Sequence, residues 1–336
     1  MAHHSARLAG VAVHLPESRL STRDAELRVA DRSTGFRPPP GIVERLTGVE
    51  RLHVMPDDWQ ASDLAAAAAR KLLADTGTDP RDVDLHLFAA ASQDMVEPAT
   101  AHMVADRLDL RCPSFDVKNA CNSVLNALEV AGALVAAGGY RRVLISCGES
   151  PSRAARWSVP DLRSFLAAIP GYTLSDAGAA LLVERSPRPG LLGFGGTADS
   201  SAWHVGTLPA GGSAHPRGDE HTYFRLDGTG LRRAFETLGL QVLHDTLTRL
   251  ALTWDDLAVI CVHQVSLPYL ESFRERLGLP ADRLVVTVAE HGNTAAASLP
   301  LQLRTALDSG RCGPGDLVGL VGLAGGISLG MGVVRL

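Results

Sequence analysis

The chain has 336 residues, 46% of them hydrophobic and 21% charged, which is enough for one large domain or two fused ones. Its formal net charge is −5 and it has no basic stripe, which argues against a nucleic-acid surface. Glycine or charge interrupts every apolar run and no signal peptide is visible, so we expect no membrane attachment. The five cysteines are scattered without a C-x-x-C pair. They therefore predict neither a disulfide framework nor a metal site, and they favour a cytoplasmic location.

Strand-like and helix-like apolar segments alternate along the chain, which indicates an α/β fold. In the first half, helices and strands are expected in alternation over residues 63–76, 82–91, 101–108, 114–117, 124–137 and 142–147. In the second half the same order recurs over residues 231–250, 256–263, 268–277, 283–288, 295–309 and 317–323. The recurrence predicts a duplicated α/β unit with halves 1–185 and 186–336. Segments 150–175 and 198–222 lack periodicity, and we expect them to be loops that shape a pocket.

Cys121 lies where a predicted strand gives way to a predicted helix, in the turn Asn119-Ala120-Cys121-Asn122-Ser123. A thiol at the start of a helix is close to unpaired N–H groups and the positive end of the helix dipole. That environment lowers a thiol pKa and favours the nucleophilic thiolate. A single cysteine in such a place is still more often structural than catalytic, so its partners decide the interpretation.

Two polar residues of the second half are candidate partners for this thiol. His263 ends a predicted strand, and Asn293 lies in the turn equivalent to the one that carries Cys121. Pseudo-symmetry would bring these strand-end turns together at the junction of the halves. A thiolate can take an acyl group from a thioester, while an imidazole and an amide can donate hydrogen bonds to an oxyanion. Alternatively, His263 is a core histidine and Asn293 an ordinary turn residue.

Five segments carry a resemblance to a known family: residues 119–121, 175–180, 263–266, 291–298 and 323–336. In these segments the chain resembles the thiolase-fold condensing enzymes, specifically β-ketoacyl-acyl-carrier-protein synthase III, and the resemblance covers nearly the whole chain. It implies a five-layer αβαβα fold with two pseudo-symmetric halves, in a homodimer. It also implies that Cys121 is acylated, and that His263 and Asn293 stabilise the enolate left by malonyl decarboxylation. The backbone N–H groups of Cys121 and Gly325 would form the oxyanion hole.

The chain departs from the family pattern at several positions. The family's His-Gln-Ala-Asn motif has Val265 and Ser266 in place of its last two residues in this chain. Leu323 stands where the family has a phenylalanine before the terminal glycines. Members primed by coenzyme A hold its adenine between a tryptophan and arginines. The corresponding positions here are Ile42, Leu46, Pro170, Gly171 and Pro268. The thioester machinery is therefore expected to be complete and the adenine clamp missing.

One further motif is a false lead. Residues 326–330 fit the G-x-S-x-G pattern of hydrolases. In such enzymes an acid and a histidine follow the serine in chain order, and neither occurs among the six residues after Gly330.

The sequence thus predicts an acyltransferase resembling synthase III, with no cofactor beyond the phosphopantetheine that arrives on the substrate. Cys121 would take an acyl group from an acyl carrier protein and condense it with a malonyl thioester, in polyketide, other secondary or fatty-acid biosynthesis. Two alternatives stay open: transfer to an alcohol, amine or second carrier, with His263 as general base, and a non-catalytic partner subunit. Candidates for the acyl pocket are Met95, Val96 and Leu323. Candidates for carrier docking are Arg232, Arg233, Arg274 and Arg276.

Overall fold

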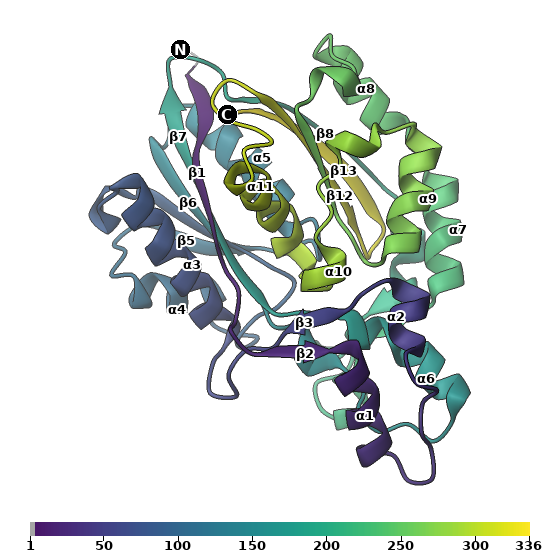
Figure 1. Cartoon of the computed structure of the whole chain (residues 1–336). Coiled ribbons are helices and arrows are strands. Elements are labelled where there is room, and N and C mark those ends of the chain that lie inside the picture. Colours follow the sequence, from purple (N-terminus) through teal and green to yellow (C-terminus); the bar gives the residue numbers. More distant parts are fainter. Residues whose placement is uncertain (1–3) are drawn as a thin grey trace.

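The computed structural model describes residues 4–336, and two β-sheets form its framework (Figure 1). The first sheet has the order β1-β7-β6-β4-β5 and the second the order β8-β13-β12-β11. The strands of the first sheet are β1 (Ser5–His14), β4 (Leu85–Ala89), β5 (Ser114–Val117), β6 (Arg142–Glu149) and β7 (Ala177–Ser186). The strands of the second sheet are β8 (Leu191–Ala198), β11 (Val259–Val262), β12 (Leu317–Ala324) and β13 (Ser328–Arg335).

Helices form three layers around these sheets, so the chain has the five-layer αβαβα arrangement of the thiolase-like fold (Figure 1). Between the sheets lie α5 (Ser123–Ala136) and α11 (Ser298–Asp308). The first sheet is covered by α3 (Ala61–Thr76) and α4 (Thr100–Arg107). The second sheet is covered by α7 (Gly228–Leu238), α8 (Gln241–Arg249) and α9 (Leu267–Leu277).

A smaller cap of short elements lies beyond the strand ends (Figure 1). It contains α1 (Thr22–Arg32), α2 (Ile42–Thr47), α6 (Leu162–Ala168) and the ribbon of β2 (Arg19–Ser21) with β3 (Arg51–His53). The remaining elements are α10 (Val288–His291), β9 (Gly206–Thr207) and β10 (Arg225–Leu226). Within residues 4–336 no helix combines the length and apolarity needed to cross a bilayer.

The two sheets repeat one topology. In the first sheet the edge strand β1 pairs antiparallel with β7, β7 pairs antiparallel with β6, and β6 pairs parallel with β4. In the second sheet β8, β13, β12 and β11 pair in the same order and with the same directions. This match supports the predicted duplication. The boundary at 185/186 stays a proposal.

Three of the predicted elements differ from the structure. The strand expected at 283–288 is reduced to an isolated bridge between Ile260 and Leu284. Buried Gln264 is the reason, because its Oε1 accepts from the N–H groups of Thr287 (3.0 Å) and Val288 (3.1 Å), which would otherwise extend the ladder. The helix expected at 231–250 breaks into α7 and α8 at Gly239, whose φ is 74°. The segments expected to be loops, 150–175 and 198–222, contain α6 and several 3₁₀ turns.

Two paired glycines let the alanine-rich helix α3 lie directly on the first sheet. A Cβ atom on Gly148 of β6 would lie 1.8 Å from the carbonyl oxygen of Ala61, and one on Gly178 of β7 would lie 2.0 Å from that of Leu64. Contacts this short are impossible, so the absence of side chains at these positions sets the spacing between helix and sheet.

We therefore expect Gly178→Ala to lower the free energy of unfolding by about 1–3 kcal/mol or more, because the helix has to move away from the sheet. Gly196→Ala in β8 is the matched control, since its Cβ would meet its nearest atom, the Leu329 carbonyl oxygen, at 3.6 Å. Denaturant unfolding of both variants measures the difference. Equal stabilities would contradict the role given to Gly178.

Candidate active site

Cys121 lies in a tight turn between β5 and α5, where the sequence predicts it. The Asn119 N–H donates to Ser123 Oγ (2.9 Å), and that hydroxyl donates to the Ala120 carbonyl (2.7 Å). Ala120 adopts the left-handed conformation with φ 45°, which is uncommon for a residue other than glycine. The turn thus stores local backbone strain immediately before the thiol, a feature typical of functional sites.

The turn that carries Cys121 is attached to the second sheet through Ser328. Asn122 donates through Nδ2 to Ser328 Oγ (2.9 Å), and Asn119 makes a longer bond to the same oxygen (3.4 Å). Gly322 of β12 leaves room for this contact, since a Cβ there would lie 2.1 Å from Asn122 Oδ1. Ser328, the serine of the G-x-S-x-G pattern, begins strand β13 and anchors the Cys121 turn.

The ionisation of Cys121 differs from the sequence-based expectation. Burial, and then the negative charge of Glu149, raise the pKa of the Cys121 thiol to about 12. The expectation of a lowered pKa is therefore wrong for the free protein. Helix α5 begins two residues later, at Ser123, so its N–H groups do not outweigh desolvation at the sulfur.

His263 follows β11 directly, and its backbone N–H donates to the Val321 carbonyl of β12 (2.9 Å). The side chain is 3% exposed, and within residues 4–336 neither ring nitrogen has a hydrogen-bond partner. Burial lowers the pKa of His263 to about 4, so the ring is neutral at ordinary pH. A core histidine would use these nitrogens internally, so their free state argues against that alternative.

The conformation of Asn293 is fixed by three hydrogen bonds. Its backbone N–H donates to the Thr173 carbonyl (2.8 Å), and its carbonyl accepts from the Ser175 N–H (2.9 Å). The side-chain Oδ1 accepts from the Ala295 N–H (3.0 Å). Because Oδ1 is the acceptor in that bond, the other end of the amide is the Nδ2 donor, which makes no hydrogen bond among the described residues.

The turns around Cys121 and Asn293 are equivalent in backbone conformation. A left-handed alanine stands directly before each of two residues, Ala120 before Cys121 and Ala295 (φ 48°) before Ala296. An α-helix begins two residues after Cys121 and two residues after Ala296. Ala296 therefore occupies in the second half the place that Cys121 occupies in the first.

Glu149, at the end of β6, is a site residue that the sequence analysis missed. It is fully buried, and its Oε1 accepts from the N–H groups of Ala91 (2.7 Å) and Ala296 (3.2 Å). Its Oε2 accepts from the N–H (3.1 Å) and the hydroxyl (2.8 Å) of Ser92. The available signal was a lone carboxylate ending the otherwise uncharged run 143–148.

The remaining pocket and oxyanion candidates lie in different environments. The N–H of Gly325 has no acceptor within residues 4–336, as a group left for an oxyanion requires. Leu323 is buried in the core of the second half. Met95 and Val96 are 50% and 65% exposed on the loop between β4 and α4, so they line no enclosed pocket of the single chain.

The four arginine side chains that are candidates for docking differ in their exposure and in their ion pairs. Arg232, Arg233 and Arg276 are exposed on α7 and α9, two of the helices that cover the second sheet, and Arg232 lies 4.0 Å from Glu236 on its own helix. Arg274 is bound to Glu271 on the same helix through Nε (2.8 Å), so it is less available for a partner.

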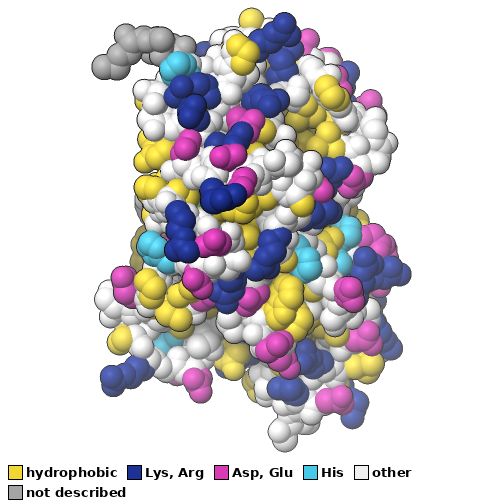
Figure 2. Space-filling model, turned by 90° about the vertical axis from the view of Figure 1, so that its left-hand side faces the viewer, with side chains coloured by type: hydrophobic (Ala, Val, Ile, Leu, Met, Phe, Trp, Pro, Cys, Tyr) yellow, Lys and Arg dark blue, Asp and Glu magenta, His cyan; other side chains and the backbone are white. Residues whose placement is uncertain are grey.

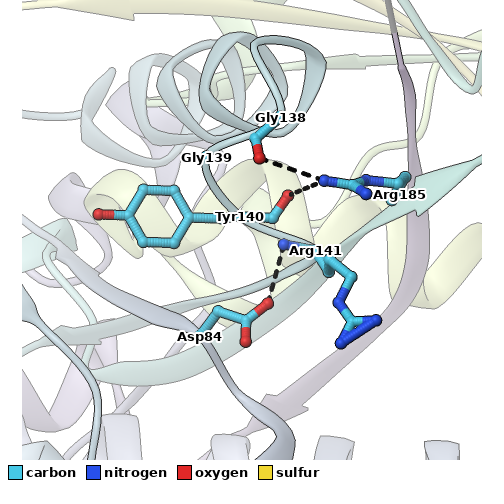
Figure 3. A pocket seen from close by; sticks show the side chains of 6 residues that line it. All are labelled: Asp84, Gly138, Gly139, Tyr140, Arg141 and Arg185. Atoms are coloured by element: carbon cyan, nitrogen blue, oxygen red, sulfur yellow. Dashed lines mark hydrogen bonds between the residues drawn. The ribbon is translucent and has the colours of Figure 1, made fainter. Parts of the chain in front are cut away.

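The surface has two cavities, of which the first lies away from Cys121, whereas the second is lined in part by Leu174, the bridge partner of Asn293. The hollow in Figure 3, about 490 Å³, is lined by Asp84, Arg141 and Arg185 around the Gly138-Gly139 turn. It lies where β4 and β6 begin, whereas Cys121 follows the end of the parallel strand β5. A second cavity of about 130 Å³ borders the cap, where the Arg28 guanidinium lies 4.8 Å from the centre of the Trp157 ring.

The duplicated five-layer fold is that of the thiolase-like, acyl-transferring condensing enzymes. Residues 115–200 match the model of the family described as "3-Oxoacyl-[acyl-carrier-protein (ACP)] synthase III". Residues 247–336 match the model of the C-terminal part of the same family. The β-ketoacyl-[acyl-carrier-protein] synthase III of Methylococcus capsulatus is 32% identical, covering 98% of both chains. The chain belongs to the 3-oxoacyl-[acyl-carrier-protein] synthase III family.

Solved structures agree with this assignment. FabH, the synthase III of Pseudomonas aeruginosa, superposes with a TM-score of 0.85 at 28% identity and covers 98% of each chain. An OleA variant from Xanthomonas campestris reaches a TM-score of 0.88 at 24% identity, over 99% of this chain and 98% of its own, and shows the shared fold alone.

If Cys121 is the nucleophile, incubation with a good acyl donor should add one acyl mass to the wild-type protein and none to Cys121→Ala. Intact-protein mass spectrometry measures the adduct, and peptide mapping locates it. Donors are drawn from a panel of acyl-carrier and acyl-coenzyme-A thioesters. An adduct on Cys112, Cys147, Cys261 or Cys312 would refute the assignment.

Proposed function

We propose that this enzyme takes an acyl group from a carrier protein onto Cys121 and condenses it with a malonyl thioester. Loss of carbon dioxide from the malonyl group would leave an enolate that attacks the acyl-cysteine and forms a β-keto thioester. The observation that supports this proposal is that two groups make no hydrogen bond within residues 4–336, the buried His263 ring and Asn293 Nδ2. A neutral imidazole and an amide can both donate to an enolate oxygen.

Transfer of the acyl group to an alcohol, an amine or a second carrier is the alternative acceptor chemistry. In that reaction the neutral His263 ring would act as the general base, and its free nitrogens permit this. An amide cannot act as a base, so the open Nδ2 of Asn293 favours condensation. A non-catalytic partner subunit would have no use for either unpaired group.

The two acceptor chemistries predict different effects at Asn293. If the enzyme condenses, Asn293→Ala should reduce release of carbon dioxide from a malonyl thioester by about 100- to 1,000-fold, the usual effect of losing one oxyanion donor. Acylation of Cys121 should stay nearly intact. Asn293→Asp is a second variant, which keeps an acceptor for the Ala295 N–H but replaces the donor with a negative charge, so it should reduce the release of carbon dioxide at least as much.

If the enzyme is a plain acyltransferase, Asn293→Ala should matter little, while His263→Ala should stop transfer to an alcohol. The measurements are trapped carbon dioxide and acyl-enzyme mass. A wild-type enzyme that releases no carbon dioxide from any malonyl thioester would favour the acyltransferase.

A carrier-bound donor is proposed because the cap offers little to an adenine ring at the expected places. Ile42 is buried at the start of α2, and Leu46 exposes an aliphatic side chain. Trp157 is the aromatic group nearby, but Arg28 already stacks on its ring and Tyr172 packs beside it (5.6 Å between ring centres).

The proposed docking surface consists of Arg232, Arg233 and Arg276. A carrier's acidic side chains would be attracted to these exposed arginines of α7 and α9. The face that carries α3 and α4 instead mixes positive and negative side chains without a patch of one sign (Figure 2). We therefore place docking on the α7 and α9 side.

Single-turnover acylation should accordingly be much faster from an acyl carrier protein than from the matching acyl-coenzyme A. Added salt should slow the carrier reaction preferentially, because exposed charges are screened over about 8–10 Å at ordinary ionic strength. Equal rates from both donors, with equal salt responses, would contradict the proposal and point to the Arg28–Trp157 pair as an adenine site.

A homodimer is part of this proposal. Strand β5 is the open edge of the first sheet, and Phe115 on it is 43% exposed. The exposed Met95 and Val96 follow β4, the strand beside it. Pairing of two β5 edges would cover this apolar group and could let Met95 and Val96 complete a partner's acyl pocket. Polyketide, other secondary or fatty-acid biosynthesis in the cytoplasm is the proposed setting.

A further inference from the structure

The Glu149 carboxylate connects three segments that meet at the site. Through Ala91 and Ser92 it holds the start of the loop between β4 and α4, and through Ala296 it holds the turn that follows Asn293. It belongs to β6 itself, on which Cys147 lies close to Cys121. All four of its contacts are donors, so the geometry is complementary to an ionised carboxylate.

The contact with Ala296 bears directly on Asn293. The N–H of Ala295 is bound by Asn293 Oδ1, and the next N–H along the chain is bound by Glu149. These two bonds together fix a turn that contains a left-handed alanine. Without the second bond, nothing else among the described residues accepts from the Ala296 N–H.

We propose that Glu149 is a positioning residue, which holds the Asn293 turn and the loop after β4 in place and sets a buried negative charge beside the Cys121 thiol. This inference rests on the proposed roles of Cys121 and Asn293. A buried carboxylate is unfavourable unless it is fully hydrogen-bonded, and a residue of this kind is costly to retain for packing alone.

The charge has a separate consequence for the thiol. Glu149 and Cys147 belong to β6, and the neutral His263 follows β11. Lys118, which follows β5, donates to Gln93 Oε1 (2.8 Å). Burial raises the pKa of Glu149, and its four donors oppose that shift. When Glu149 is ionised, its charge raises the pKa of the Cys121 thiol in addition to burial, so the thiol is protonated at neutral pH.

Two substitutions separate the reach of Glu149 from its charge. Glu149→Asp keeps the charge but is one methylene shorter, so it cannot span Ala91, Ser92 and Ala296 together. Glu149→Gln keeps the length and removes the charge, and its NH2 group also replaces one of the two accepting oxygens. Glu129→Gln, at an exposed position of α5, makes the same chemical change outside the site and is the control.

The position of the turn is read by hydrogen–deuterium exchange of the segment 290–298. Loss of one amide hydrogen bond raises the equilibrium constant for local opening about tenfold. This segment should therefore exchange about tenfold faster in Glu149→Asp than in the control. Where the wild type releases carbon dioxide from a malonyl thioester, that rate should fall about 10- to 100-fold. Wild-type exchange in a folded Glu149→Asp protein would overturn the positioning role.

The effect of the Glu149 charge is measured as the pH dependence of the rate at which iodoacetamide alkylates Cys121. Peptide mass spectrometry follows the alkylation. Removing a negative charge lowers the thiol pKa, so Glu149→Gln should react about 3- to 30-fold faster at a given pH below the pKa. Glu149→Asp should keep the wild-type profile. Equal profiles for Glu149→Gln and the control would overturn the charge effect.

These two readouts need no substrate, so they test Glu149 even if the enzyme does not condense. Absence of carbon dioxide release in the wild type would reject the proposed function alone. Circular dichroism and thermal melting establish that each variant is folded. If Glu149→Gln does not fold, exchange in Glu149→Asp still decides the positioning role.

Discussion

The site depends on a few buried hydrogen bonds that cross the junction between two copies of one α/β unit. The most demanding acceptor among them is the Glu149 carboxylate, which must be fully paired because burial disfavours its charge. Ser328 provides the second attachment, through the two asparagines that flank Cys121. These attachments hold the turns that carry the thiol and the amide, while the backbone of His263 is held separately by its bond to Val321.

The groups around the thiol suit chemistry in which charge appears only during reaction. In the free protein the Cys121 thiol and the His263 ring are both uncharged, because burial opposes their ionised forms. The donors, by contrast, are already oriented when the chain folds, so they need no rearrangement when a thioester oxygen or an enolate becomes negative. Such a site stabilises a transient anion better than a resting one.

Much of this could be predicted from the sequence. The alternation of elements and its recurrence were sufficient for the α/β duplication, and the turn residues around Cys121 marked the end of β5 and the start of α5. The failures came from tertiary contacts. The side chain of Gln264 replaces the ladder of an expected strand, and the desolvation of Cys121 outweighs the helix start that should have lowered its pKa.

Glu149 could not be assigned from the sequence, because its role depends on partners 57 and 147 residues away in the chain. A lone carboxylate after an apolar strand is equally compatible with a solvated strand end. Similarly, nothing in the sequence shows that Arg28 stacks on Trp157, since those residues meet only through the packing of the cap.

The equivalence of Ala296 and Cys121 has a consequence for stoichiometry. Both halves contain the same strained turn before a central helix, a geometry suited to presenting a nucleophile. In the second half the residue in that place is an alanine, and its N–H group is occupied by Glu149. Duplication of the fold has therefore not duplicated the thiol, and the proposed acylation of Cys121 implies at most one acyl group per chain.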